Sequence, residues 1–462
     1  MRGCWTCKGR RKKCDGTRPS CNECNRLQLD CKGYHERPLL WEDDQIRVGM
    51  RRRGWRRKHK DGDQASVHSG SGANSDKTST AMLAVNSGCI SPTVTPEGSL
   101  SSAEVQLLGW YINRFAVSYP SFNHGQNPFL SAILPMAFHT PCLMKAMLAV
   151  AGTQACREQP QLRPVMLQCR IRALRGLRAQ LSPGLQAGSS IKDVSGALAC
   201  SLMLFIYEKI ECEDNALGGH LSYAASLVAR LLPSYQHLDV DVRFLVQLFI
   251  HNDIYASFAL RTRPALDCLP AATLSTTVLQ GNTFLGMLAS ISRLAASPNT
   301  PLDDVLELID ALHIWQPSMS WLPSSASARE QTPAMVTAGE VHRRAAMTAF
   351  ERSLGLSPNI TSIHSALDSL STIPAADPIT ASLLWPTVVL GAEVADESRR
   401  QALAGRLRVL ADQTGYKQYT KALRLLEDCW ATAATRQADE VNTCMSWVDV
   451  MHNTGNFLLC ML

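Results

Sequence analysis

Six cysteines near the amino terminus fall into two copies of one spacing, and this repeat constrains the fold more than any other feature. Each copy has the form C-x2-C-x6-C, and the second lies seventeen positions after the first. The six residues are Cys4, Cys7, Cys14, Cys21, Cys24 and Cys31. Two thiolates separated by two residues can bind one tetrahedral ion, and a third cysteine follows after one or two helical turns. Such regular pairs are typical of zinc sites, whereas a disulfide framework or scattered thiols are the alternatives.

The number of cysteines limits how metal can be bound. Two four-coordinate ions need eight bonds, but six cysteines supply only six ligand atoms, so two of the cysteines must bridge both ions. The internal repeat indicates that the leading cysteine of each copy, Cys4 and Cys21, is a bridge. We therefore predict two zinc ions as cofactors, held in an anionic cluster.

Basic residues are concentrated around the first half of this repeat. Between Cys7 and Cys14 they are Lys8, Arg10, Arg11, Lys12 and Lys13. Residues 1–60 contain 18 Lys and Arg against 7 Asp and Glu, whereas the remainder contains 28 against 33. A basic arm on a nearly neutral body is typical of a nucleic-acid-binding protein. The alternative is that these side chains are solvated charges that only offset the cluster.

The segment from Cys4 to Cys31 resembles the fungal binuclear zinc-cluster transcription factors. It meets their pattern C-x2-C-x6-C-x5-12-C-x2-C-x6-8-C throughout, and Pro19 lies where that family turns the chain between its two halves. The resemblance implies a DNA-binding module in which the end of a short helix enters the major groove and reads a CGG triplet.

The same resemblance assigns roles to the basic residues by position. Arg10 and Arg11 would face the bases, because an arginine fork can bond O6 and N7 of guanine together. Lys8, Lys12 and Lys13 would contact phosphates, which gives affinity without sequence information.

The chain is long enough, at 462 residues, for two or three domains. We expect a zinc-cluster domain with two short helices over residues 1–35 and a basic extension over 36–60. A second basic run at 51–60 indicates an import signal, phosphate contacts or both, with a merely charged linker as the alternative. Residues 61–100 are rich in Gly, Ser, Asn and Thr, which predicts a flexible linker.

The rest of the chain, residues 101–462, is predicted to be a large all-α regulatory domain, so that the fold class is mainly α. Apolar residues recur at three and four positions almost everywhere. Thr140-Pro141 is typical of a helix start, and Ser190 with Asp193 fits a capping box. A further apolar stripe runs over residues 242–249. Other helices are expected at 102–116, 162–181, 217–232 and 421–434.

These helices, with the segment His251–Tyr255, resemble the helical fungal-specific transcription factor domain over roughly residues 100–462. The resemblance implies a regulatory role: contact with the transcription machinery or coregulators, and sensing of a small-molecule effector. We therefore predict a sequence-specific DNA-binding regulator of RNA polymerase II transcription, located in the nucleus. Control of a biosynthetic, secondary-metabolite gene cluster follows from the resemblance alone.

Parts of the sequence also resemble two other classes of protein. Asp303, Asp304 and Glu307 resemble the aspartate-rich magnesium box of terpene cyclases, but Asn252-Asp253 precedes this box instead of following it. Acidic residues that begin a helix are the simpler explanation, so no enzymatic activity is expected. A helical enzyme with a zinc targeting module stays as an alternative. So does a zinc-knuckle-like RNA binder, although Trp5 is the only aromatic residue within the cluster for stacking bases.

Membrane association and secretion are not expected. Ten further cysteines are dispersed without C-x2-C pairs, which is typical of a reducing compartment. The cluster begins too close to residue 1 for a signal peptide, and the longest strongly apolar uncharged run, 194–207, is shorter than the roughly 20 residues of a membrane span. No apolar heptad continues through residues 32–60, so a dimer formed by the body and a monomer on one half-site both remain open.

Overall fold

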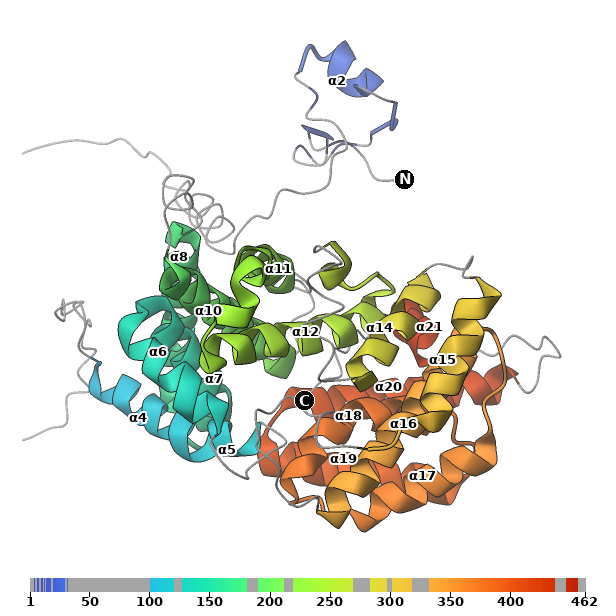
Figure 1. Cartoon of the computed structure of the whole chain (residues 1–462). Coiled ribbons are helices and arrows are strands. Elements are labelled where there is room, and N and C mark those ends of the chain that lie inside the picture. Colours follow the sequence, from blue (N-terminus) through green and yellow to red (C-terminus); the bar gives the residue numbers. More distant parts are fainter. Residues whose placement is uncertain are drawn as a thin grey trace, which may run out of the picture. The chain divides into compact units, whose positions relative to one another are not determined.

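The structure is a computed structural model of the chain, and it divides into two compact units, residues 1–92 and 93–462 (Figure 1). In the first unit it describes residues 4, 6, 7, 10, 12, 14–17, 20–29 and 31. In the second it describes residues 100–119, 127–180, 190–211, 219–268, 283–296, 301–317, 332–436 and 446–455. The predicted basic extension and nearly all of the predicted linker lie outside the described residues.

The amino-terminal unit contains helix α2, Asn22–Arg26, which begins directly after a cysteine of the repeat. Cys21 is its N-cap, and the Cys21 sulfur accepts a hydrogen bond from the backbone N–H of Cys24. In the first copy of the repeat, Thr6 and Cys7 are helical, and the Arg10 N–H donates to the Thr6 carbonyl over 3.2 Å. Each copy therefore places a helical turn next to its first pair of cysteines.

The second unit is helical, and the part of it that the structure describes contains no strand. Its α-helices are α4 (Ser102–Trp110), α5 (Ala116–Ser118), α6 (Leu134–His139), α7 (Pro141–Glu158), α8 (Arg163–Gln180), α10 (Ile191–Glu211), α11 (Gly219–Leu231), α12 (Val240–Leu260), α14 (Thr283–Ala296), α15 (Leu302–Ile314), α16 (Pro333–Ser353), α17 (Ile360–Thr372), α18 (Leu384–Gly391), α19 (Glu397–Thr414), α20 (Lys417–Arg436) and α21 (Trp447–Thr454). Short 3-10 helices are η3 (Pro160–Leu162), η4 (Leu232–His237), η5 (Ala265–Cys268) and η8 (Pro378–Leu383). The predicted mainly α fold class is confirmed.

Local sequence signals place several of these helix starts. Helix α7 has Thr140 as its N-cap and Pro141 at its first position, as the Thr-Pro pair predicts. At the start of α10, the Ser190 N–H donates to the Asp193 carboxylate, and the Asp193 N–H donates to the Ser190 hydroxyl. The predicted helix at 102–116 differs in one respect. After α4 it continues as a π-helical turn, η1 (Tyr111–Phe115), and a second such turn, η2 (Phe129–Ile133), precedes α6.

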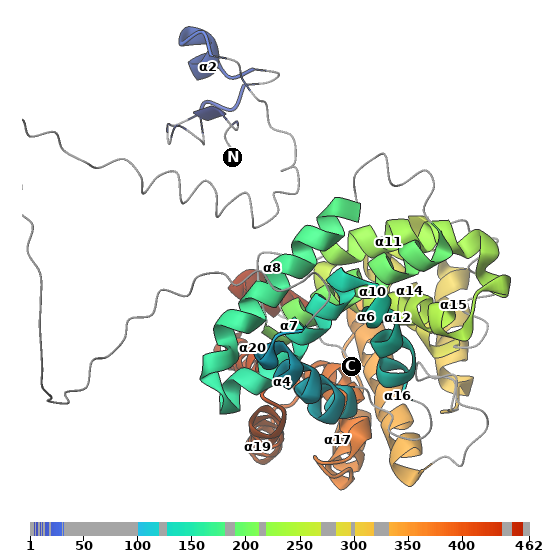
Figure 2. The ribbon, with the colours of Figure 1, turned by 90° about the vertical axis from the view of Figure 1, so that its left-hand side faces the viewer.

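The core is built around helices that are buried on every side. In α10 every residue from Val194 to Ile210 is buried, and α7 and α12 are nearly as enclosed. Such all-round apolar helices occupy the interior of a bundle. Helix α8 packs on α7, α11 packs on α10, and α10 also packs on α12. Both views place α8 and α11 at the top of this unit and α17 and α19 at the bottom (Figures 1 and 2).

Aromatic contacts connect the earlier helices to the later ones. Trp385 on the fully buried helix α18 meets Tyr255 of α12 edge to face, with ring centroids 5.3 Å apart. The same indole stacks at 6.2 Å against His342 of α16. Burial lowers the pKa of His342 to about 3, so this imidazole is neutral at physiological pH. None of the described helices has both the length and the apolar character that a membrane crossing requires.

The buried carboxylate of Glu104 connects α4 to α7 and α8. Glu104 accepts a hydrogen bond from Lys145 Nζ of α7 over 2.6 Å, and Arg172 of α8 lies 3.4 Å away. Glu104 also forms a capping box with Ser101 at the start of α4. Burial alone would raise the pKa of Glu104, but the Lys145 hydrogen bond and the Ser101 N–H outweigh it and lower that pKa below its ordinary 4.5.

We expect Glu104→Ala to destabilise the protein by about 3 kcal/mol, because it leaves the largely buried Lys145 ammonium without its partner. Since the folded-state pKa of Glu104 is lowered, this stabilisation is complete above pH 4.5 and is lost as the pH falls below it. Urea unfolding followed by circular dichroism measures the change.

The matched control is Glu427→Ala. Glu427 lies 3.8 Å from Arg408, and both side chains are more than half exposed. Exposed pairs of this kind contribute less than about 1 kcal/mol. Equal losses of stability in the two variants would contradict the structural role of Glu104.

Candidate metal centre and nucleic-acid interface

The described residues of the two copies of the cysteine repeat form equivalent hydrogen bonds. The Cys7 N–H donates to Cys4 Sγ over 3.4 Å, and at the equivalent position in the second copy the Cys24 N–H donates to Cys21 Sγ over 3.3 Å. In each copy the backbone of the C-x2-C pair therefore folds around the leading sulfur.

The last cysteine of each copy folds back onto the first. Cys14 Sγ accepts from the Cys4 N–H over 3.3 Å, and Cys31 Sγ accepts from the Cys21 N–H over 3.5 Å. This return brings a third sulfur to each pair, although it is ten positions away along the chain.

The sulfur atoms form two groups of four that share two members. One group is Cys4, Cys7, Cys14 and Cys21, and the other is Cys4, Cys21, Cys24 and Cys31. Within each group all sulfurs lie within 4.8 Å of one another. The shared pair is Cys4 and Cys21, whose Sγ atoms are 3.5 Å apart.

These separations fit zinc. Four sulfurs that are each about 2.3 Å from one tetrahedral ion lie about 3.8 Å from one another. In the first group Cys7 Sγ is 3.6 Å from Cys21 Sγ, and in the second Cys4 Sγ is 3.7 Å from Cys24 Sγ. The two groups therefore have the size of two zinc sites with a common edge.

A metal ion that binds here must displace protons from buried cysteines. Burial raises the pKa of Cys7, Cys21 and Cys24 to about 12, so without a positive charge these groups are neutral thiols at physiological pH. A divalent ion in their midst stabilises the thiolate form, because a coordinating thiol is deprotonated. The donor set is thus suited to Zn²⁺.

A carboxylate connects the two copies of the repeat. Asp15 accepts from the Thr17 hydroxyl and from the backbone N–H of Asn22 (3.1 Å) and Glu23 (3.4 Å) in the first turn of α2. The Thr17 hydrogen bond and these N–H groups lower the pKa of Asp15 to about 2. Sequence reasoning did not single out Asp15. No local signal indicated it, because Asp15 lies seven positions before Asn22, although the first-turn N–H groups of a helix do need acceptors.

The basic residues of the first copy are only partly described. Arg10 and Lys12 are exposed, and the Lys12 N–H donates to the Cys7 carbonyl over 3.0 Å. Arg10 contributes, after Arg26, to lowering the pKa of Glu23 on α2. Lys8, Arg11 and Lys13 lie outside the described residues. The described part of the first copy thus presents positive charge at the surface beside the sulfur cluster.

The acidic residues that resemble a magnesium-binding box have other roles in the described part of the structure. Asp303 and Asp304 lie in the first turn of α15, as expected for carboxylates that begin a helix. Asp253 is buried in α12, where its oxygens accept from the N–H groups of Ala265 (3.0 Å) and Leu266 (2.9 Å). Among the described residues, no group of three possible ligands includes either Asp253 or Asp303.

Each of the curated relatives matches only a short segment, about a tenth of this chain or less. The chain is 50% identical over 42 residues to pestheic acid cluster transcriptional regulator 3 of Pestalotiopsis fici, which is 9% of this chain and 7% of that protein. It is 60% identical over 37 residues to sterol uptake control protein 2 of Candida albicans, covering 8% and 5% of the two chains. Against transcriptional regulatory protein pro1 of Neurospora crassa it is 44% identical over 45 residues, or 10% and 6%.

Family models match both units, whereas no solved structure matches the chain. Residues 2–39 match the fungal Zn(2)-Cys(6) binuclear cluster domain, a domain that binds two zinc ions. Residues 106–460 match the fungal specific transcription factor domain, which is most of the chain. The protein therefore belongs to the fungal zinc-cluster transcription regulators that carry a fungal-specific transcription factor domain.

Proposed function

We propose that this protein is a nuclear, sequence-specific regulator of RNA polymerase II transcription that binds CGG-type half-sites through its zinc-cluster module. One observation carries the proposal: two folded copies of one cysteine repeat share Cys4 and Cys21, and exposed Arg10 and Lys12 lie on the first copy. A metal cluster with basic side chains at its surface is suited to the negatively charged phosphates of DNA.

In this proposal Cys4 and Cys21 bridge the two zinc ions. Each of the other cysteines, Cys7, Cys14, Cys24 and Cys31, binds one ion. The support is the composition of the two sulfur groups, which overlap at the bridging pair and nowhere else.

In this proposal, different basic residues contact the bases and the phosphates of DNA. Arg10 and Arg11 read guanine, because a guanidinium can bond O6 and N7 together. Lys8, Lys12 and Lys13 bind phosphates and position the module without reading sequence. The exposure of Arg10 and Lys12 supports this for the two residues that the structure describes.

The helical body, residues 101–462, is proposed to regulate the output through coregulators, an effector or self-association, and to have no catalytic role. Relatives named as regulators of a pestheic acid cluster and of sterol uptake illustrate the range of processes that proteins with a similar zinc cluster control. We propose a biosynthetic gene cluster as the target, supported by the first of these names.

The bridging assignment predicts how zinc content responds to single cysteine changes. Cys4→Ala and Cys21→Ala should each lose both ions, because each removes a ligand from both sites. Cys14→Ala should keep one ion, since the group of Cys4, Cys21, Cys24 and Cys31 stays complete. Native mass spectrometry of the full chain counts the bound zinc.

Cys169→Ala is the control for a buried cysteine outside the amino-terminal unit, and it should keep both ions. One tightly bound zinc in both Cys4→Ala and Cys21→Ala would show that these residues are not the bridges.

Base reading and phosphate binding are separable by mutation. Arg10→Ala should cost about 1–3 kcal/mol on a CGG duplex and little on a random duplex, because it removes a base contact. Lys12→Ala should weaken binding to both duplexes equally and reduce the slope of log affinity against log salt by about 1. Fluorescence anisotropy at several salt concentrations measures both effects.

Arg10→Lys is the matched variant, since it keeps the charge and removes the two-pronged fork. It should lose specificity nearly as far as Arg10→Ala does. If Arg10→Ala weakens specific and random duplexes by the same factor, Arg10 binds phosphate and the base-reading role is wrong.

A further inference from the structure

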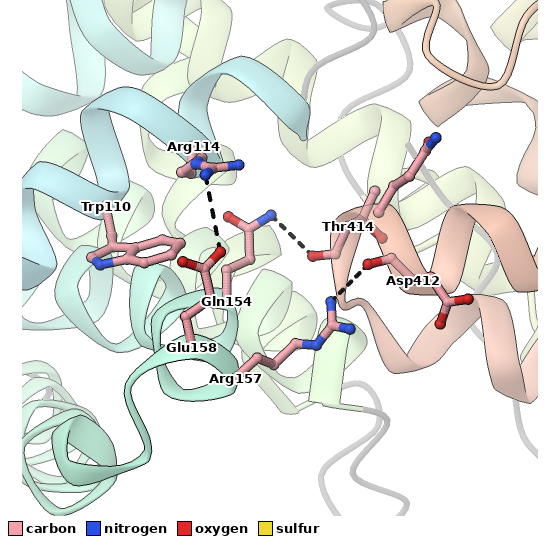
Figure 3. A pocket seen from close by; sticks show the side chains of 8 residues that line it. Trp110, Arg114, Gln154, Arg157, Glu158, Asp412 and Thr414 are labelled. Carbon is pink, nitrogen blue, oxygen red and sulfur yellow. Dashed lines mark hydrogen bonds and ion pairs between the residues drawn. The ribbon is translucent and has the colours of Figure 1, made fainter.

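A polar pocket lies in the helical body, where the ends of two helices meet a third segment. It has a volume of about 250 Å³. Helix α7 contributes Gln154, Arg157 and Glu158, α19 contributes its last residues up to Thr414, and Trp110 and Arg114 come from α4 and η1 (Figure 3). The proposed DNA-binding role uses none of these residues.

Gln154 brings an unsatisfied hydrogen-bond acceptor to this pocket. Its side chain is buried, and its Nε2 donates to the Ser118 hydroxyl and to the Thr414 carbonyl, each over 3.1 Å. The Thr414 carbonyl can only accept, so it fixes which end of the amide is nitrogen. The opposite atom, Oε1, has no hydrogen-bond partner. In Figure 3 this oxygen points away from Thr414, toward the side where Arg114 and Glu158 lie.

Arg157 is held in place on another side of the pocket. Its Nη1 donates to the Asp412 carbonyl over 3.2 Å. Its guanidinium packs on Gly415, the residue with positive φ that ends α19, and a Cβ at position 415 would lie 2.4 Å from Nη1. A guanidinium has five N–H donors in a fixed plane. The donors that are not directed at Asp412 are available to a carboxylate.

The other charged pair at the pocket, Arg114 and Glu158, interacts only weakly. Arg114 lies 3.9 Å from Glu158, with 63% and 61% of the two side chains exposed, and its guanidinium stands 5.6 Å from the ring centre of Trp110. Exposed pairs at such separations are weak. Both side chains are therefore able to rearrange around an entering ligand at little cost.

We propose that this pocket binds a small zwitterion of the α-amino acid class. When Arg114 and Glu158 move apart, the ligand's ammonium group donates to the Glu158 carboxylate and to the otherwise buried Gln154 Oε1. The ligand's carboxylate accepts from Arg157 and Arg114. Arg114 and Arg157 bring positive charge to the pocket and Glu158 brings negative charge, so a ligand that carries both charges is favoured over a bare cation or anion.

The size of the pocket agrees with this class. Pockets for drug-sized ligands have volumes of about 300–1,000 Å³, and 250 Å³ lies below that range. Trp110 offers an aromatic face for the side chain of the ligand. Because Gln154 and Thr414 are 260 positions apart, a ligand between α7 and α19 would join distant parts of the body.

The test measures binding to the full-length protein without DNA, so its outcome is independent of the proposed DNA-binding role. Each standard L-amino acid is added singly, with differential scanning fluorimetry first and calorimetry on any that respond. At least one should raise the unfolding midpoint by about 2–5 °C at saturation. The absence of any shift across the whole set would overturn the proposal.

Variants assign the binding to this pocket. Glu158→Gln and Arg157→Gln should each weaken the affinity for that amino acid about tenfold or more, since each removes one charged contact. Glu427→Gln is the matched control, because its pair with Arg408 is equally exposed and lies outside the pocket. Unchanged affinity in both pocket variants, with unchanged circular dichroism, would contradict the assignment.

Chemical analogues test the ligand class. The N-acetyl derivative of the amino acid that binds lacks the ammonium charge, and the matching amine lacks the carboxylate. Both should bind at least about tenfold more weakly, because each forfeits one half of the charged contacts. If the amine binds as tightly as the amino acid, the pocket is a cation site and the zwitterion proposal is wrong.

Discussion

The amino-terminal module depends on the contact between two sulfur atoms, Cys4 Sγ and Cys21 Sγ, which lie 3.5 Å apart. Each belongs to both groups of four sulfurs, so this pair fastens one copy of the repeat to the other. So short a segment cannot bury a sufficient core, and metal binding supplies folding free energy in such modules. Metal binding, rather than hydrophobic packing, is therefore expected to order the segment that carries Arg10.

The helical body is stabilised by hydrophobic packing rather than by metal binding. Its central helices, α7, α10 and α12, are enclosed by their neighbours, and the chain there is long enough to bury a large core without metal. Polar contacts in this body join segments that are far apart in sequence. Glu104 with Lys145 connects α4 to α7, and Gln154 with Thr414 connects α7 to α19. The side chain of the second contact, Gln154, keeps a buried oxygen without a hydrogen-bond partner beside the pocket that we propose as a ligand site.

Much of this organisation was predictable from the sequence because it rests on local patterns. The cysteine spacing predicted the two metal groups, and Ser190 with Asp193 predicted the start of α10 from residues three positions apart. Contacts between distant segments were not predictable in this way. Nothing near Glu104 in the sequence indicates Lys145, and nothing near Gln154 indicates Thr414, because packing of whole helices brings these residues together. Asp15 was missed for a related reason, since its acceptor role becomes visible only once α2 is placed beside it.

X-ray absorption spectroscopy at the zinc edge tests the shared-sulfur centre most directly. Zinc–sulfur bonds of about 2.3 Å around a shared edge of 3.5 Å place the two ions about 3 Å apart. The account predicts four sulfur neighbours per zinc at about 2.3 Å and a zinc–zinc separation near 3 Å. A first shell that contains nitrogen or oxygen, or the absence of any zinc–zinc scattering, would contradict it.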